Sequence, residues 1–221
     1  MAAQARILLL PRSPLETTID RDTQPRLRVA NADFVTPRLL VGGDLDYHDE
    51  KAAAQLAELV EVGVTHIVDA RIEASDEDFV AARVPAMAYL HHGVDDAGQR
   101  IPAAWFDVGV DFALSALEDD PDAMVLTHCH MGINRGPSLG FAVLLAQGWD
   151  PIDALNRIRT ARPIAFVAYA EDALHWHNGR TGGSSRQLAD DLRRLAEWRE
   201  ANELDMENVI RGIRRQEARG L

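Results

Sequence analysis

The chain has 221 residues, of which 47% are hydrophobic, and this is enough for one folded domain with a sizeable core. Its 35 acidic and 23 basic side chains give a net charge of −12. This balance argues against nucleic acid or an anionic membrane as a general partner, because both require a basic surface. A single cysteine cannot form an intramolecular disulfide, so we expect a protein of the reducing cytoplasm.

Residues 1–28 are expected to form an N-terminal extension. Its residues 6–10 are interpreted as an added strand that packs on or covers an edge. The apolar run Ile7–Leu10 ends at Pro11 and is too short for a signal peptide or a membrane span. We assign no chemistry to this segment.

The main domain is expected to occupy residues 29–179. Hydrophobic periodicity in its first part predicts, in order, a strand ending in a glycine turn at 35–43, a helix at 49–62, and strands at 64–70 and 87–91. In the helix, Leu56, Leu59 and Val60 are expected to be buried. The acidic segment 73–78 is interpreted as a solvated loop or helix start. Arg71 is expected near the rim of a site at this end of the sheet.

The segment His91–Gln99 follows the last of these strands and precedes a helix predicted at 102–118. Asp95, Asp96 and Gly98 are good turn residues, and glycine also permits mobility. The neighbouring pair His91-His92 does not predict a metal site, because adjacent residues on a strand point to opposite faces and the chain has no spaced second Cys/His pair. We expect neither a metal nor another cofactor.

The most informative stretch is His128-Cys-His-Met-Gly-Ile-Asn-Arg-Gly-Pro-Ser138, which contains the one cysteine. The apolar residues 124–127 before it predict a buried strand, and residues 139–146 after it predict a buried helix. Pro137 suits the first turn of that helix, where its missing N–H costs nothing. The sequence therefore predicts a strand, a tight loop and a helix.

A loop that enters a helix N-terminus directs several backbone N–H groups into one concavity, which favours an anion. Gly132 allows the tight turn, and the planar guanidinium of Arg135 can bind two phosphate oxygens. Cys129 would lie at the base of this positive pocket, which favours its thiolate form. A thiolate beneath a bound phosphate is a nucleophile directed at phosphorus. The alternative is a buried structural cysteine beside a surface arginine.

His128-Cys129 followed after five residues by Arg135 resembles the signature of the cysteine-dependent protein tyrosine phosphatase superfamily, and the short domain is most similar to the dual-specificity branch. The resemblance covers about residues 30–178. It implies an α/β single domain with a central, mostly parallel sheet flanked by helices. It also implies hydrolysis of phosphotyrosine, and of phosphoserine or phosphothreonine, through a phosphocysteine. The phosphate would bind to Arg135 and to the loop residues His130, Met131, Gly132, Ile133 and Asn134.

The leaving oxygen must be protonated, and the resemblance implies an aspartate from a mobile loop upstream of the cysteine. Asp95 and Asp96 both occupy that place, and Asp96 fits the register better. His128 is expected to orient the loop and to favour the thiolate.

One position departs from the family pattern. The resemblance implies Ser or Thr directly after the arginine, where a hydroxyl helps the thiolate to leave the phosphoenzyme, but this chain has Gly136. Ser138 either substitutes for that hydroxyl or points elsewhere. Because of this departure, one alternative function is a phosphate-binding module that turns over its substrate poorly. A phosphoglucan or phosphoinositide substrate is the other alternative, and the absence of lysine from the loop weakens the phosphoinositide case.

After the loop, Asp150 and Pro151 predict an N-cap and first turn, and the helix should end before Arg162. Three arginines in and just after that helix are expected on a solvated face, with a basic edge near the pocket as the alternative: Arg157, Arg159 and Arg162. A further helix is predicted at 168–178, then a linker at 179–185. Residues 180–221 are expected to form a C-terminal extension of two amphipathic helices that pack on the domain. The sequence leaves both a monomer and a homodimer open.

Overall fold

The computed structural model describes residues 26–217, so the strand predicted at residues 6–10 lies outside the described part. A five-stranded sheet forms the centre, with the strand order β1-β2-β5-β3-β4. Its strands are β1 (Ala32–Thr36), β2 (Leu39–Gly42), β3 (His66–Arg71), β4 (Ala88–Val94) and β5 (Val125–His128). Only β1 runs antiparallel to its neighbour. The predicted α/β class with a mostly parallel central sheet is therefore confirmed.

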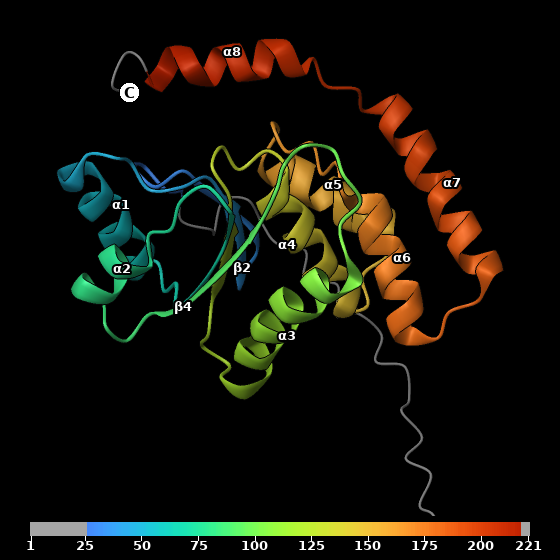
Figure 1. Ribbon diagram of the computed structural model, residues 1–221, viewed down its shortest axis with the longest axis horizontal. Helices are drawn as coiled ribbons and strands as arrows, with labels where there is room; N and C mark the ends of the chain where they lie inside the picture. The colour runs from blue at the N-terminus through green and yellow to red at the C-terminus, as the bar shows by residue number, and fades with distance from the viewer. Residues whose placement is uncertain (1–25, 218–221) are drawn as a thin grey trace, which may run out of the picture.

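Helices cover both faces of the sheet (Figure 1). One face carries α1 (Asp49–Glu61) and α2 (Glu77–Arg83), and the other carries α3 (Ala103–Asp119), α4 (Arg135–Ala146), α5 (Pro151–Ala161) and α6 (Ala170–Thr181). Neighbouring residues of β5 alternate between the two cores: Val125 packs with α3 and α4, and Leu126 packs with α1. Because both faces are covered, nearly every residue of β2, β3 and β5 is buried.

Three predictions differ from the structure. The run 35–43 is not one strand, because Pro37 and Arg38 form a turn that separates β1 from β2. Val60 is 42% exposed, so the buried stripe of α1 is narrower than expected. The linker is shorter than expected, because α6 continues through Thr181 and ends at Gly182, whose φ of 68° suits a left-handed C-cap.

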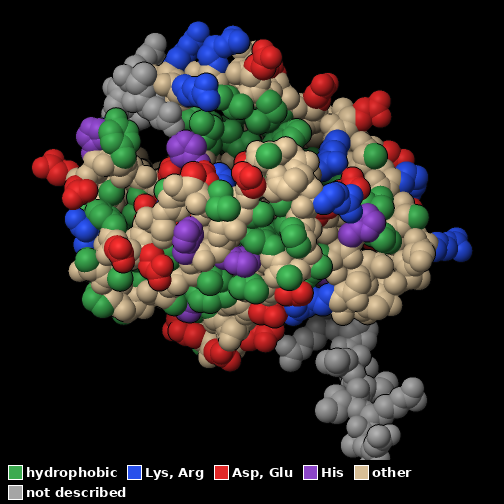
Figure 2. All heavy atoms as spheres, in the orientation of Figure 1, with side chains coloured by type: hydrophobic (Ala, Val, Ile, Leu, Met, Phe, Trp, Pro, Cys, Tyr) green, Lys and Arg blue, Asp and Glu red, His purple; other side chains and the backbone are tan. Residues whose placement is uncertain are grey.

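The C-terminal helices are α7 (Ser185–Ala201) and α8 (Met206–Glu217). Leu195 and Trp198 of α7 are buried in the same core as α5 and α6, so α7 extends the domain core. Helix α8 crosses the top of the view in Figure 1. On the face drawn in Figure 2, Asp and Glu side chains are spread widely, and basic side chains gather where α8 lies. Among the described residues, no helix is both long and apolar enough to span a bilayer.

Candidate active site

The loop after β5 lies at the carboxyl end of the central strand, between β2 and β3. Cys129 begins the loop, is 3% exposed, and donates its backbone N–H to the carbonyl of Gly42 at 3.2 Å. Gly132 has a φ of 65°, and a Cβ there would lie 2.4 Å from the Gly42 carbonyl carbon. Only glycine fits this turn.

Arg162 supports the loop from behind. It is buried, and its Nε and Nη2 donate to the carbonyls of Gly132 (2.6 Å) and Met131 (2.9 Å). The carboxylate of Asp33, on β1, lies 2.8 Å from Nη1 of Arg162 and balances the charge of the guanidinium. The expectation of a solvated helix face was therefore wrong for Arg162. Arg162 therefore fixes the conformation of the loop through two of its carbonyl groups.

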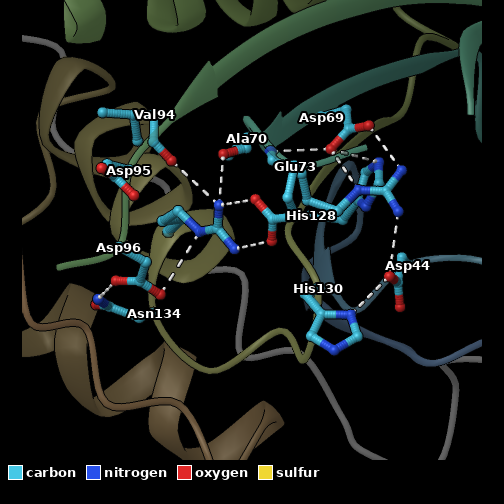
Figure 3. A network of polar contacts seen from close by, with 12 residues as sticks. Asp44, Asp69, Ala70, Glu73, Val94, Asp95, Asp96, His128, His130 and Asn134 are labelled. Atoms are coloured by element: carbon cyan, nitrogen blue, oxygen red, sulfur yellow. Dashed lines mark hydrogen bonds and ion pairs between the residues drawn. The ribbon is translucent and has the colours of Figure 1, made fainter. Parts of the chain in front are cut away.

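Arg135, the first residue of α4, is buried and bound on two edges. Its partners Glu73 and Asp96 are labelled in Figure 3. Its Nη1 and Nη2 donate to the two carboxylate oxygens of Glu73 at 2.7 and 2.6 Å. Its Nε lies 3.5 Å from Oδ2 of Asp96. Burial alone would lower the pKa of Arg135, but hydrogen bonding to Glu73 and the electrostatic effect of the neighbouring acidic groups raise it overall. The hydrogen bond from Arg135 lowers the pKa of Glu73 to about 2, so both groups stay charged.

Asp95 and Asp96 follow β4, but the structure places them differently. The Asp96 carboxylate lies beside Arg135, and its Oδ1 accepts hydrogen bonds from Asn134 Nδ2 at 2.6 Å and the Tyr169 hydroxyl at 2.9 Å. The Asp95 carboxylate takes no part in these contacts, while its backbone carbonyl accepts from Gln99 at 2.6 Å. Of the two candidate acids, Asp96 is the one brought to Arg135.

A second polar network lies behind the loop. Arg71 is buried, and its Nε and Nη2 bind Asp69 at 2.9 and 2.7 Å. Its Nη1 donates to Oδ2 of Asp44 at 3.1 Å. The same oxygen of Asp44 is hydrogen-bonded to Nδ1 of His130 at 2.8 Å. His130 is half exposed, so Asp44 links the rim of the loop to the buried arginine (Figure 3).

His128 faces this network at its inner end. Its Nε2 lies 3.7 Å from Oδ1 of Asp69, and its Nδ1 has no hydrogen-bond partner among the described residues. Burial lowers the pKa of His128 despite the opposing charge of Asp69, so the imidazole is neutral near pH 7. Burial would raise the pKa of Asp69, but the hydrogen bonds from Arg71 and Tyr89 and the charge of Arg71 together lower it.

Comparisons with known proteins address the fold. No family model matches the chain. Human dual specificity protein phosphatase 13B is 27% identical over 138 residues, which cover 60% of this chain and 65% of that protein. The crystal structure of PTPMT1 in complex with PI(5)P matches with a TM-score of 0.57 at 18% identity, covering 69% of this chain and 97% of that one. The crystal structure of human DUSP28 matches with a TM-score of 0.56 at 19% identity, and the match covers 68% of this chain and 95% of that one.

The chain has the fold of the cysteine-dependent protein tyrosine phosphatase superfamily. The resemblance inferred from His128, Cys129 and Arg135 is thereby confirmed, and the sequence match points to its dual-specificity branch.

In this phosphatase-like domain, the departure at Gly136 has a steric cause. A Cβ at this position would lie 2.8 Å from both the Cα and the carbonyl carbon of His128. Thr127 further fixes the turn by donating its hydroxyl to the Gly136 carbonyl at 2.9 Å. The backbone of α4 therefore packs too close to β5 for a serine or threonine side chain.

Ser138 is fully buried one turn into α4. Its hydroxyl lies 3.4 Å from Asn134 Oδ1 and accepts from the backbone N–H of Tyr169 at 3.3 Å. Both contacts lie on the side of α4 that faces Asp96. Ser138 thus supports the surroundings of the acid loop, and neither contact involves Cys129.

Sequence reasoning did not single out two residues of the site. Glu73 was included only in an acidic segment interpreted as solvated, and its side chain is indeed 47% exposed while it binds Arg135. Tyr169 was only part of a predicted helix. The signal for Glu73 was its place two residues after β3, at the same sheet end as Cys129. We find no sequence signal for Tyr169.

Proposed function

We propose that this chain is a phosphatase that hydrolyses phosphate monoesters through a phosphocysteine on Cys129. The observation that carries this proposal is the convergence of Cys129, Arg135 and Asp96 at the carboxyl end of β5. They supply a nucleophile, a cation for the phosphate oxygens, and an acid on the side where a leaving group would depart. The fold and the match to a dual specificity phosphatase support the same class of reaction.

In the first step, the Cys129 thiolate attacks phosphorus, the S–P bond forms, and the bond to the leaving oxygen breaks. Asp96 transfers its proton to that oxygen. Arg135 and the backbone N–H groups of residues 130–135 stabilise the charge on the three equatorial oxygens. In the second step, Asp96 takes a proton from water, whose oxygen attacks phosphorus, and the S–P bond breaks. Phosphate and the thiolate are released. This sequence uses no metal or organic cofactor.

As substrate we propose a singly phosphorylated group, phosphotyrosine first and phosphoserine or phosphothreonine second. The charged side chains at the rim include the acids Asp44, Glu73 and Asp96. The nearby arginines 71, 135 and 162 are buried and paired with carboxylates. A second phosphate would therefore meet repulsion at this rim, which disfavours a polyphosphorylated inositol.

Hydrolysis of p-nitrophenyl phosphate by the wild type and Cys129→Ser between pH 5 and 8 tests this function. Turnover by the wild type and none by the variant is the expected result. Adding Asp95→Asn and Asp96→Asn identifies the acid, and we expect a large loss only for Asp96→Asn. Turnover that survives in Cys129→Ser would contradict the cysteine mechanism.

A phosphate-binding module with poor turnover is the second candidate. It is favoured by Gly136, because no hydroxyl can occupy the position after Arg135. A slow second step would leave phosphate on Cys129. Mass spectrometry of the protein quenched during turnover distinguishes the two cases, since accumulation of stable phosphocysteine supports the binding module.

A further inference from the structure

Asp96 lies on a loop whose neighbouring residues are exposed, yet its carboxylate is held in one place. Two donors, Asn134 Nδ2 and the Tyr169 hydroxyl, converge on the same oxygen, Oδ1. The other oxygen, Oδ2, is turned toward Nε of Arg135 at 3.5 Å. Since Oδ1 already accepts two hydrogen bonds, a proton on this carboxyl group belongs on Oδ2, the oxygen nearer the phosphate site.

Both donors are themselves fixed. Asn134 Oδ1 accepts from the backbone N–H of Ala168 at 2.6 Å, which settles the direction of its amide group. The backbone N–H of Tyr169 donates to the buried hydroxyl of Ser138 at 3.3 Å. Phe166 donates its N–H to the carbonyl of Ile133 at 2.7 Å. The segment before α6 is thus attached to the phosphate loop at several points.

This segment also contains a strained residue. Val167 has a φ of 53°, the one positive value among the described residues other than glycine. A β-branched residue in the left-handed region costs energy, and such strain persists only where the surrounding contacts enforce it. Here the enforced turn directs the next residues so that the hydroxyl of buried Tyr169 reaches Asp96.

We propose that Tyr169 and Asn134 are positioning residues that hold Oδ1 of Asp96 and thereby present the proton on Oδ2 to the leaving oxygen. The inference rests on the proposed phosphatase function and adds to it a cradle for the acid, built from the phosphate loop and the start of α6. Burial and the nearby Asp96 raise the pKa of Tyr169 to about 12, so its hydroxyl remains a donor at neutral pH.

The test compares two substrates that need the acid to different degrees. Phenyl phosphate has a poor leaving group and depends strongly on proton transfer, whereas p-nitrophenyl phosphate has a good one and depends on it less. For Tyr169→Phe we expect kcat/KM on phenyl phosphate, which reports the formation of the phosphocysteine, to fall roughly tenfold, with a much smaller loss of kcat/KM on p-nitrophenyl phosphate. Tyr47→Phe is the matched control, because this tyrosine is 85% exposed and should leave both rates unchanged.

The same substitution is then made in the Asp96→Asn background. If Tyr169 acts through Asp96, Tyr169→Phe causes no further loss there. Equal losses on both substrates, or the same fractional loss in both backgrounds, would overturn the inference while the phosphatase function stood. Should Tyr169→Phe fail to fold, Asn134→Ala removes the other donor without adding a charge beside the phosphate, and it is expected to show the same dependence on leaving group. A wild type that hydrolyses neither substrate would overturn the proposed function and this inference together.

Discussion

The guanidinium of Arg135 has two edges, and a carboxylate lies at each. Glu73 takes the Nη1–Nη2 edge with two short hydrogen bonds, while Asp96 lies farther away at Nε. A phosphate that approaches Arg135 must therefore bind through the Nε side unless it displaces Glu73. Glu73 orients the arginine and at the same time opposes a second negative charge.

Replacing Glu73 with glutamine should tighten oxyanion binding and slow turnover. The amide removes the competing charge but holds the arginine less firmly, since one charged hydrogen bond is lost. We expect the Kd for vanadate to fall by a factor of about 5 and kcat to decrease. Calorimetric titration with vanadate measures the first effect. Weaker vanadate binding would show that orientation matters more than charge.

Restoring the family's serine at position 136 should not restore a faster second step. A Cβ there would lie 2.8 Å from His128, so α4 or β5 must shift. We expect Gly136→Ser to destabilise the fold by about 1–3 kcal/mol and to lower activity. Urea unfolding gives the first quantity. A variant that folds normally and turns over faster would refute the steric account.

Among the secondary-structure elements, α5 and α7 are joined by two defined side-chain contacts. Asp150 caps α5, because its Oδ1 accepts from the backbone N–H of Ile152 at 2.9 Å, and the same oxygen binds Arg194 of α7 at 2.8 Å. One carboxylate therefore begins one helix and anchors another. The Trp198 indole N–H adds a second link by donating to Asn156 of α5 at 2.7 Å.

Asp150→Ala should lower the free energy of unfolding by about 1–2 kcal/mol, since it removes the cap and the ion pair. Asp150→Asn keeps a capping oxygen and loses only the charge, so its effect should be smaller. Chemical denaturation of the two variants beside the wild type measures the difference. Equal effects would mean that the ion pair contributes more than the cap.

The sequence was sufficient for elements whose signals are local. The strand-loop-helix around Cys129 and the cap at Asp150 follow from residues that are neighbours in the chain. Glu73 and Arg162 could not be placed in the same way, because their partners lie on other elements. A buried arginine and an exposed one look alike in sequence. Only the packing of the sheet edge and of α5 decides between them.

At the scale of the whole molecule, the ionisable groups with shifted pKa values determine how stability depends on pH. Burial lowers the pKa of His66, His128 and His177 from 6.5. The unfolded chain therefore binds more protons than the fold as pH drops through this value, and stability falls. Asp69 and Glu73 have lowered pKa values. Their contribution to the free energy of unfolding is therefore present above about pH 4.5 and is lost as the pH falls toward 2.

We accordingly expect the urea midpoint to decrease between pH 7 and pH 5 and to decrease again below pH 4.5. His177→Gln, which lies on α6 away from the phosphate loop, should reduce the slope of the first decrease without changing the second. The measurement is a series of urea titrations at fixed ionic strength. A midpoint that stays constant between pH 7 and pH 5 would contradict the assignment of neutral buried histidines.

The central place of β5 also has a consequence for how the protein matures. Its partners, β2 and β3, both come far earlier in the chain, so the cysteine loop can close only after three distant segments have assembled. Such non-local pairing is slow compared with helix formation. In the native fold Cys129 is 3% exposed at the base of its loop, whereas before the loop closes its thiol is open to oxidants from all sides. A chain oxidised at that stage would enter the fold without the thiolate on which the proposed reaction depends.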